Sequence, residues 1–210
     1  MTSFVSAAHP WPSNAELIAD IATLGYLDGK VLDVTYGLGT FWKVWQPDDL
    51  TGCDLDPYKS QWPNDDYGPQ SVDFTHLPFE RPFDHFDAVV FDPPYKLNGT
   101  PDEAEARYGT HEITRWQDRM SLIEAGVVEC CRVSSRYVLV KCQDQVCSGQ
   151  IRWQTILVTD TAAMNGFGLV ERFDMLGTGR PQPEGRSQVH ARNRPSTLLV
   201  FERAKGTNLT

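Results

Sequence analysis

Short apolar runs alternate with amphipathic stretches along the whole chain. Strands are predicted where a run is short, apolar and rich in β-branched or aromatic residues. The predicted strands are residues 30–34, 50–54, 71–74, 86–91, 137–141, 169–176 and 197–202. The run 86–91 is the clearest, because Pro93 and Pro94 follow it and stop it. Seven strands with helices between them predict an α/β protein with a doubly wound sheet.

Helices are predicted between these runs. Ser13 and Glu16 have the spacing of a capping box, which predicts a helix that begins near Ser13. Its apolar stripe would be Leu17, Ile18, Ile21 and Leu24. A second capping-box spacing, Thr114 and Gln117, predicts a helix that runs to about residue 132, and a further helix is predicted over residues 151–164.

The composition is that of an ordinary globular protein. The chain has 210 residues, of which 40% are hydrophobic, and this is enough to bury a sizeable core. We expect a single domain over residues 1–210. No apolar run approaches the roughly 18–20 residues of a membrane span, and residues 1–9 lack the basic and apolar regions of a signal peptide. No membrane association and a cytoplasmic location are therefore expected.

The cysteines predict a reduced, intracellular environment. They are five in number, so they cannot all pair within one chain, and none has the paired spacing of zinc ligands. We interpret them as core residues and predict no metal site. The five are Cys53, Cys130, Cys131, Cys142 and Cys147.

The net charge of the chain is -9 at pH 7. Proteins that bind nucleic acid without regard to sequence are usually basic, because neutralisation of phosphates supplies their affinity. An acidic chain can bind nucleic acid through a local basic surface. The charge argues against a nucleic-acid substrate and says nothing against the chemistry proposed below.

A glycine turn follows the first predicted strand. Gly37 and Gly39 let the backbone turn sharply and approach a ligand closely. Asp33 ends the strand, and Asp54, with Asp56 as the alternative, stands where an acidic residue that holds ribose hydroxyls is expected. The third glycine of the dinucleotide fingerprint is absent, which suits a ligand without a pyrophosphate. A tight turn that binds no ligand is the other interpretation.

A group of hydrogen-bond acceptors follows the strand 86–91. The segment is Asp92-Pro93-Pro94-Tyr95. Proline has a carbonyl but no N–H, and an ionised aspartate is only an acceptor. The segment therefore suits an –NH2 group, and Tyr95 adds a flat face on which a base can stack. A rigid turn that only ends the strand is the other interpretation.

The two motifs, in this order, resemble those of the amino-methyltransferases that act on adenine N6 and cytosine N4 of nucleic acids. That family carries a glycine turn for S-adenosylmethionine and a catalytic motif of Asp, Asn or Ser, then Pro-Pro, then an aromatic residue. The resemblance extends over about residues 31–201. It implies a Rossmann-like, mostly parallel seven-stranded sheet of the class I methyltransferase type. Large DNA-modifying members have a separate target-recognition domain, for which this chain has no room.

The resemblance implies S-adenosylmethionine as the cofactor and assigns the residues of the site. The catalytic residues would be Asp92, Pro93, Pro94 and Tyr95. The cofactor-binding residues would be Asp33, Thr35, Tyr36, Gly37, Gly39, Thr40, Asp54, Asp73 and Phe74. Asp92 and the Pro93 carbonyl would accept the two N–H groups of the substrate amine and direct its lone pair toward the methyl group. In a duplex the base must first be flipped out. No metal or covalent nucleophile is required.

Two polar segments are candidates for contact with the substrate. Residues 96–115 are predicted to form a loop over it, and residues 180–194 carry four arginines and one acid. The substrate-binding residues would be Lys96, Asn98, Arg180, Arg186, Arg192 and Arg194. Solvated surface loops are the alternative in both cases. Trp42, Trp45 and Trp62 are interpreted as packing residues, and the role of Lys141, which ends a strand beside the presumed site, is open.

We expect methylation of adenine N6 in DNA, because in the resembled family Asp leads the motif mostly in adenine enzymes. The alternatives that stay open are cytosine N4 in DNA, adenine in RNA, and the amide or amine of a protein glutamine or small molecule. A non-catalytic binding module with the same fold is the alternative of a different class. We expect a monomer or a homodimer.

Overall fold

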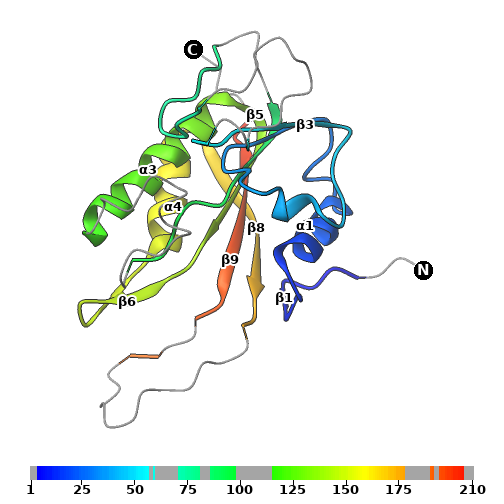
Figure 1. The fold of residues 1–210 in the computed structure, drawn as a ribbon. Helices are drawn as coiled ribbons and strands as arrows, with labels where there is room; N and C mark the ends of the chain where they lie inside the picture. The colour runs from blue at the N-terminus through cyan, green and yellow to red at the C-terminus, as the bar shows by residue number, and fades with distance from the viewer. Residues whose placement is uncertain are drawn as a thin grey trace.

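A seven-stranded sheet forms the centre of the protein (Figure 1). The computed structural model describes residues 4–56, 59, 71–80, 86–97, 115–177, 190–191 and 194–205. The strand order is β1-β8-β9-β5-β4-β2-β3. In chain order the strands of this sheet are β1 (Ala8–His9), β2 (Lys30–Asp33), β3 (Asp49–Gly52), β4 (Phe86–Phe91), β5 (Ser134–Cys142), β8 (Phe167–Met175) and β9 (Ser196–Arg203).

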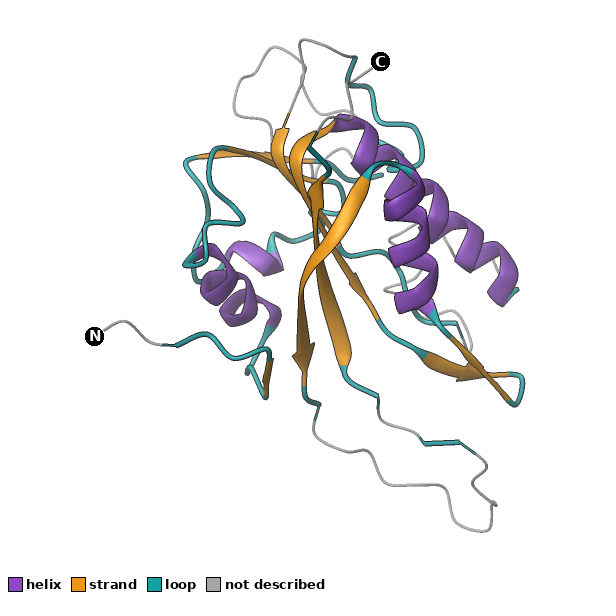
Figure 2. Cartoon of the chain, turned by 180° about the vertical axis from the view of Figure 1, so that it is seen from behind, coloured by secondary structure: helices purple, strands orange, loops and turns teal. Residues whose placement is uncertain are grey.

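Helices cover both faces of the sheet (Figures 1 and 2). One face carries α1 (Asn14–Ala22) and the 3-10 helix η1 (Thr40–Trp42), and the other carries α3 (Trp116–Val133) and α4 (Gln154–Met164). Two buried clusters correspond to these layers, because alternate residues of each buried strand point to opposite faces. The predicted α/β fold with a doubly wound, mostly parallel sheet is confirmed.

The path of the chain places a switch point between β2 and β4. The strands β3, β2, β4 and β5 are mutually parallel, whereas β9 is antiparallel to both of its neighbours, β5 and β8. From β2 the chain moves outward to β3 and then returns to form β4 on the other side of β2. Ligands of such sheets bind beyond the carboxyl ends of the strands at this point.

The first helix begins as its sequence predicts. Ser13 is the N-cap, and its hydroxyl accepts a hydrogen bond of 3.1 Å from the backbone N–H of Ala15. The Ser13 hydroxyl also bonds to the carboxylate of Glu16. The predicted apolar stripe is buried except for Leu24, which is 46% exposed because it lies beyond the last helical residue, Ala22.

The helix α3 begins differently from its prediction. Its N-cap is Arg115, which makes no side-chain capping bond, so the predicted capping box of Thr114 and Gln117 is wrong. Thr114 itself lies outside the described residues. The backbone N–H of Arg119 instead bonds to the carbonyl of Arg115, which closes the first turn of the helix.

The predicted strand at residues 71–74 is wrong. The backbone N–H of Val72 donates to the carbonyl of Asp54, and the Ser71 hydroxyl donates to that of Leu55, so the segment is tied to the end of β3 as a loop. Asp73 then forms a turn with Thr75. The seventh strand of the sheet is β1, which pairs in parallel with the end of β8.

A hairpin precedes α4, so the predicted helix 151–164 begins late. The strands β6 (Gln145–Cys147) and β7 (Gln150–Arg152) pair antiparallel through a turn in which Ser148 and Gly149 both have positive φ, 53° and 75°. Two such residues are what a short hairpin turn requires. Pairing with β6 therefore holds residues 150–152 extended, and α4 begins at Gln154.

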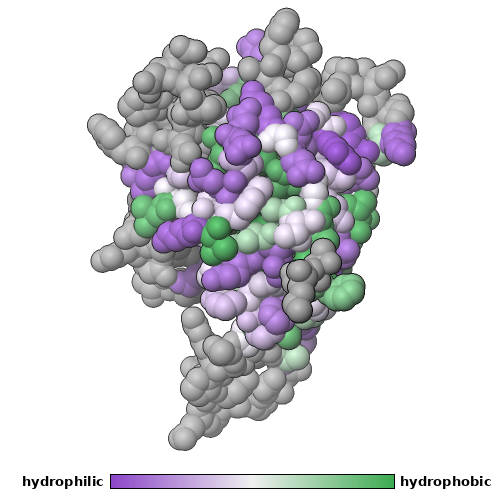
Figure 3. All heavy atoms as spheres, turned by 90° about the vertical axis from the view of Figure 1, so that its right-hand side faces the viewer, coloured by the Kyte–Doolittle hydropathy of each residue, from purple (hydrophilic) through white to green (hydrophobic). Residues whose placement is uncertain are grey.

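The described residues agree with the composition. All five cysteines are buried and unpaired, so the interpretation of them as core residues is confirmed. No described helix is long and apolar enough to cross a membrane. On the side that carries α1 and β3, hydrophilic residues cover much of the described surface, with hydrophobic residues in small groups between them (Figure 3).

Candidate functional site

The glycine turn after β2 adopts the backbone conformation that its sequence predicts. Gly37 and Gly39 have φ values of 57° and 62°, in the left-handed region that glycine tolerates best. The backbone N–H of Tyr36 donates to the carbonyl of Cys53 at 2.9 Å, which joins the turn to the end of β3. The turn therefore lies across the carboxyl ends of β2 and β3, where a ligand of this sheet is expected.

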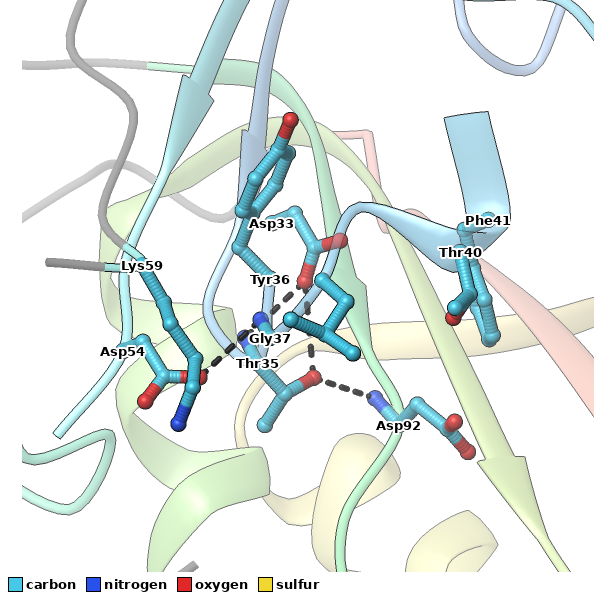
Figure 4. Close-up of a pocket in the computed structure, with 10 residues that line it drawn as sticks. Asp33, Thr35, Tyr36, Gly37, Thr40, Phe41, Asp54, Lys59 and Asp92 are labelled. Atoms are coloured by element: carbon cyan, nitrogen blue, oxygen red, sulfur yellow. Dashed lines mark hydrogen bonds between the residues drawn. The ribbon is translucent and has the colours of Figure 1, made fainter. Parts of the chain in front are cut away.

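Asp54 links the turn to the strand that follows it. Its Oδ2 accepts a hydrogen bond of 2.9 Å from the N–H of Gly37, and its Oδ1 accepts one of 2.8 Å from the N–H of Asp56. These bonds hold the carboxylate in one orientation at the rim of the turn (Figure 4). Asp54 therefore offers a carboxylate in a fixed orientation, as the hypothesis of an acidic ribose-binding residue requires.

Asp33 lies under the turn and is only 3% exposed. Its carboxylate accepts hydrogen bonds from the N–H of Thr35 at 2.9 Å and from Nε1 of Trp42 at 2.8 Å. Burial nevertheless raises the pKa of Asp33 to about 7, and the nearby charge of Asp92 adds to this. Trp42 is a packing residue, as interpreted, and it also orients Asp33, which the sequence did not reveal.

Asp92 directly follows β4 and brings the second motif to the first. Its backbone N–H donates a hydrogen bond of 2.9 Å to the hydroxyl of Thr35. Its side-chain Oδ1 is buried and has no hydrogen-bond partner among the described residues. Burial raises the pKa of Asp92 to about 6, and the positive charge of Lys141 acts in the opposite direction. An unpartnered acceptor at this position is available to an incoming N–H group.

Two glutamines fix the backbone after Asp92. The carbonyl of Tyr95 accepts hydrogen bonds from Nε2 of Gln145 at 2.8 Å and from Nε2 of Gln154 at 2.6 Å. The N–H of Leu97 donates to Oε1 of Gln145 at 3.0 Å. The ring of Tyr95 is partly buried and packs against the cluster on the α3 and α4 face. Sequence reasoning missed both glutamines; in the sequence they stand as polar residues at the ends of apolar runs.

A pocket of about 120 Å³ joins the two motifs (Figure 4). Its lining residues are Asp33, Thr35, Tyr36, Gly37, Leu38, Thr40, Phe41, Asp54, Lys59 and Asp92. Six of the predicted cofactor residues are among them, together with the predicted catalytic aspartate. Leu38, Phe41 and Lys59 were not predicted, and Lys59 forms an ion pair of 2.9 Å with Asp56.

The three other predicted cofactor residues lie outside that pocket. Phe74 lines a smaller adjoining cavity with Val34, Leu55 and two residues of the main pocket, Thr35 and Asp54. Asp73 is exposed, and its Oδ1 accepts hydrogen bonds from the backbone N–H and the hydroxyl of Thr75. Gly39 contributes the second left-handed residue of the turn.

Only two of the predicted substrate-binding residues are described. Lys96 is half-buried, and its carbonyl accepts a hydrogen bond from the guanidinium of Arg119. The guanidinium of Arg194 lies over the ring of Trp153, 4.8 Å from its centroid. The other four lie outside the described residues: Asn98, Arg180, Arg186 and Arg192. Residues 98–114 of the predicted loop also lie outside them.

The structure resembles solved methyltransferases. No protein-family model matches the sequence, and no curated protein is similar to it in sequence. The N-methyltransferase NodS from Bradyrhizobium japonicum WM9 superposes with a TM-score of 0.54 at 12% identity, over 91% of this chain and 94% of that one. The fold is that of the class I methyltransferases.

Two further solved structures agree with this fold. Magnesium protoporphyrin IX methyltransferase (ChlM) from Synechocystis PCC 6803, with bound S-adenosylhomocysteine, has a TM-score of 0.52 at 14% identity, over 91% of this chain and 81% of that one. TrmN from Thermus thermophilus has a TM-score of 0.52 at 15% identity, over 90% of this chain and 48% of that one. At these identities the similarity is one of fold, and the chemistry has to be argued from the pocket.

The chemistry of the pocket in this methyltransferase fold is acidic. Three carboxylates, of Asp33, Asp54 and Asp92, line it, and Asp33 and the Oδ1 atom of Asp92 are shielded from water. Such a pocket suits a ligand that carries positive charge and hydroxyl or amino donors. Within the described part of the chain, no group of three or more His, Cys, Asp or Glu side chains is arranged to hold a metal ion.

Proposed function

We propose that this protein is an S-adenosylmethionine-dependent methyltransferase that methylates the exocyclic N6 amino group of adenine in DNA. One observation carries the proposal: Oδ1 of Asp92 is buried, has no hydrogen-bond partner, and belongs to a residue that lines the same pocket as the glycine turn. A buried acceptor without a partner is costly for the free protein. A bound amino group would supply the missing N–H.

The cofactor is assigned to the turn because the residues there fit it. Asp54 would accept the ribose hydroxyls, and the backbone of Gly37 would allow the close approach that the turn provides. Asp33 would offset the positive charge of the cofactor from below. Phe74, in the small adjoining cavity, would lie beside the adenine ring. When bound, S-adenosylmethionine supplies a reactive methyl group on a sulfonium.

The residues of the chain would orient the substrate amine and stabilise its charge. An adenine amino nitrogen is a weak nucleophile, because its lone pair is shared with the ring. Asp92 and the Pro93 carbonyl would accept its two N–H groups, turn the lone pair toward the pocket and stabilise the positive charge that develops on nitrogen. The bonds from Gln145 and Gln154 to the Tyr95 carbonyl hold this segment still, so the acceptors are preorganised.

The choice of adenine rests on Asp92 itself, since Asp leads the motif mostly in adenine enzymes of the resembled family. A nucleic-acid substrate is supported by two stacked arginines. The guanidinium of Arg152 lies 3.7 Å from the ring centroid of Trp116, and that of Arg194 lies over Trp153. Neither guanidinium forms an ion pair with a described carboxylate, so both are available to phosphates. This provides a local basic surface on an acidic chain.

Mass spectrometry of nucleosides tests the proposal. DNA and RNA from cells that express the chain would be digested and compared with material from cells that express Asp92→Ala. We expect N6-methyladenine in DNA, and only with the unchanged chain. Methylation of cytosine alone or of RNA alone would contradict the substrate assignment.

Calorimetry separates the role of Asp92 from the binding of the cofactor. Asp92→Ala should abolish methyl transfer and leave the affinity for S-adenosylhomocysteine within a few-fold, because Asp92 is assigned to the amine. Near-normal turnover by a folded Asp92→Ala protein would refute the catalytic assignment.

A further inference from the structure

A buried lysine lies beside the unpartnered aspartate. The parallel strands β4 and β5 pair so that Phe91 is opposite Val140. Asp92 is the next residue after Phe91, and Lys141 is the next residue after Val140. Both project toward the face that carries α1 and η1, because Asp92 lines the pocket with Phe41 and Lys141 bonds to Asn14. The two opposite charges therefore leave neighbouring parallel strands on the same side of the sheet.

Among the described residues, Lys141 has only neutral partners within contact distance. Its side chain is 2% exposed, and its ammonium donates to Oδ1 of Asn14, at the start of α1. It lies 3.7 Å from the sulfur of Met175 and 5.9 Å from the ring centroid of Phe41. An ammonium buried among neutral groups is unfavourable unless a negative charge compensates it.

Few charged groups are available to compensate Lys141. The elements packed around it are α1, η1, β8, β9 and β4, which contribute Asn14, Phe41, Met175, Leu198 and Asp92. Of these only Asp92 is titratable. The charge of Asp92 also acts on Asp33 of β2, whose pKa it helps to raise. Cys142, the neighbour of Lys141 in β5, is a thiol that stays neutral because burial raises its pKa. Among the described groups, Asp92 is therefore the carboxylate whose charge favours the ammonium form of Lys141.

We propose that Lys141, anchored by Asn14, is a positioning residue that keeps the Asp92 carboxylate ionised. The ionised carboxylate can accept hydrogen bonds from the N–H groups of the substrate amine and stabilise the positive charge that develops on its nitrogen. The proposal rests on the methyl transfer assigned to this pocket. A protonated carboxyl group carries a donor on one oxygen and no negative charge, so the ionised form is the better acceptor for the N–H groups of the amine. Anchoring matters because the attraction between the two charges falls with their separation.

The direction of the electrostatic effect agrees with this geometry. Burial raises the pKa of Asp92 to about 6, and Lys141 lowers it. Removing the ammonium therefore leaves burial unopposed. The carboxyl group of Asp92 would then keep its proton up to a higher pH, so activity would begin to fall at a higher pH as the solution is acidified.

The proton affinity of Asp92 is the direct test. It would be measured by NMR of protein labelled at the aspartate carboxyl carbon, with the resonance assigned by Asp92→Asn. We expect Lys141→Met, which keeps the length and removes the charge, to tighten proton binding by Asp92 about tenfold or more. Lys141→Arg should restore a value near that of the unchanged protein. Lys30→Met, which removes a lysine from the amino end of β2, is the matched control and should leave the proton affinity of Asp92 unchanged.

Kinetics add a second readout. In Lys141→Met the acidic limb of the pH profile of kcat/KM should move to higher pH, while the affinity for S-adenosylhomocysteine stays the same. If Lys141→Met does not fold, Asn14→Ala takes its place, and loss of the anchor should tighten proton binding by Asp92 in the same direction. Unchanged proton affinity of Asp92 would overturn the inference whatever the substrate proves to be. A shifted affinity in a protein that methylates no amine would refute the proposed function instead.

Discussion

The hydroxyl of Thr35 accepts a hydrogen bond from the backbone N–H of Asp92, 57 residues away in the chain, at 2.9 Å. Thr35 belongs to the glycine turn, and its hydroxyl also lies 3.4 Å from Oδ1 of Asp33. One side chain thus connects the carboxylate under the proposed cofactor site to the strand end that carries the proposed catalytic aspartate. This hydrogen bond adds to the pairing of β2 with β4, which brings the two motifs together.

Replacing Thr35 tests that connection. Thr35→Val keeps the shape of the side chain and removes the acceptor, which leaves the N–H of Asp92 without its partner. We expect a loss of about 1–3 kcal/mol in the free energy of unfolding, as for other buried donors that lose their partner, together with a lower kcat. Thr35→Ser keeps the hydroxyl and is the control. Equal stability of the two variants in denaturant titrations would show that the hydrogen bond is dispensable.

Gly37 should be required for binding of the cofactor. Its φ of 57° strains any other residue, by about 1–2 kcal/mol for an ordinary side chain and more for a β-branched one. An added Cβ would meet its nearest neighbours at 3.8 and 3.9 Å, so the space is ordinary and the cost comes from the backbone. Gly37→Val should therefore weaken S-adenosylhomocysteine binding in calorimetry by shifting the N–H that bonds to Asp54.

Gly149→Val is the matched control for that substitution. Gly149 has a φ of 75° in the hairpin turn, and nothing lies within 4 Å of an added Cβ. It imposes a similar backbone strain at a place outside the pocket. We expect it to reduce stability and leave cofactor affinity unchanged, and equal weakening by both valines would mean that the effect is one of stability alone.

The affinity for S-adenosylmethionine should depend on the ionisation of Asp33. Burial raises the pKa of Asp33 to about 7, so the carboxyl group is partly protonated near neutral pH. A positively charged ligand binds the ionised form better, so affinity should fall as the pH is lowered through about 7, by up to tenfold per pH unit, and level off above it. Calorimetry from about pH 5.5 to about 8.5, a range centred on the expected midpoint, measures this dependence of cofactor affinity on pH.

Asp33→Asn controls for that pH dependence. It removes the titration and keeps an acceptor for one of the two hydrogen bonds, since Thr35 bonds to Oδ1 of Asp33 and Trp42 bonds to Oδ2. Its cofactor affinity should be lower at high pH and nearly constant across the range. A steep pH dependence that persists in Asp33→Asn would assign the titration to another group.

The stacked arginines should carry the salt dependence of DNA binding. Replacing both Arg152 and Arg194 with Gln should weaken binding and reduce the log–log salt slope by about 0.9 for each duplex phosphate that the protein no longer neutralises. Arg136→Gln is the control. Arg136 is an exposed arginine near the start of β5, whereas the pocket lies beyond the carboxyl ends of the strands. A slope that is the same in the double variant and the control would assign phosphate binding to other residues.

Local pattern was enough for the elements whose signals are local. The strand β4 occupies residues 86–91 as predicted, because its apolar run is bounded by Pro93 and Pro94. The start of α1 follows from the Ser13 cap, and the glycine turn and Asp92 both come at strand ends. Strand ends meet at one edge of a parallel sheet, so the two motifs could be assigned to one site before the hydrogen bond between them was known.

Pairing and compensation of charge were decided by the tertiary structure. The two-residue strand β1 exists because β8 offers it an edge, whereas residues 71–74 satisfy their backbone at the end of β3. The bond from Trp42 to Asp33 has no local signal in the sequence. The strand end placed Lys141 beside the presumed site, but its electrostatic effect on Asp92 came only from the tertiary structure. Hydrophobic period tells which way a side chain faces, but a buried charge is balanced by whichever group the fold brings near it, and that depends on which strands are neighbours.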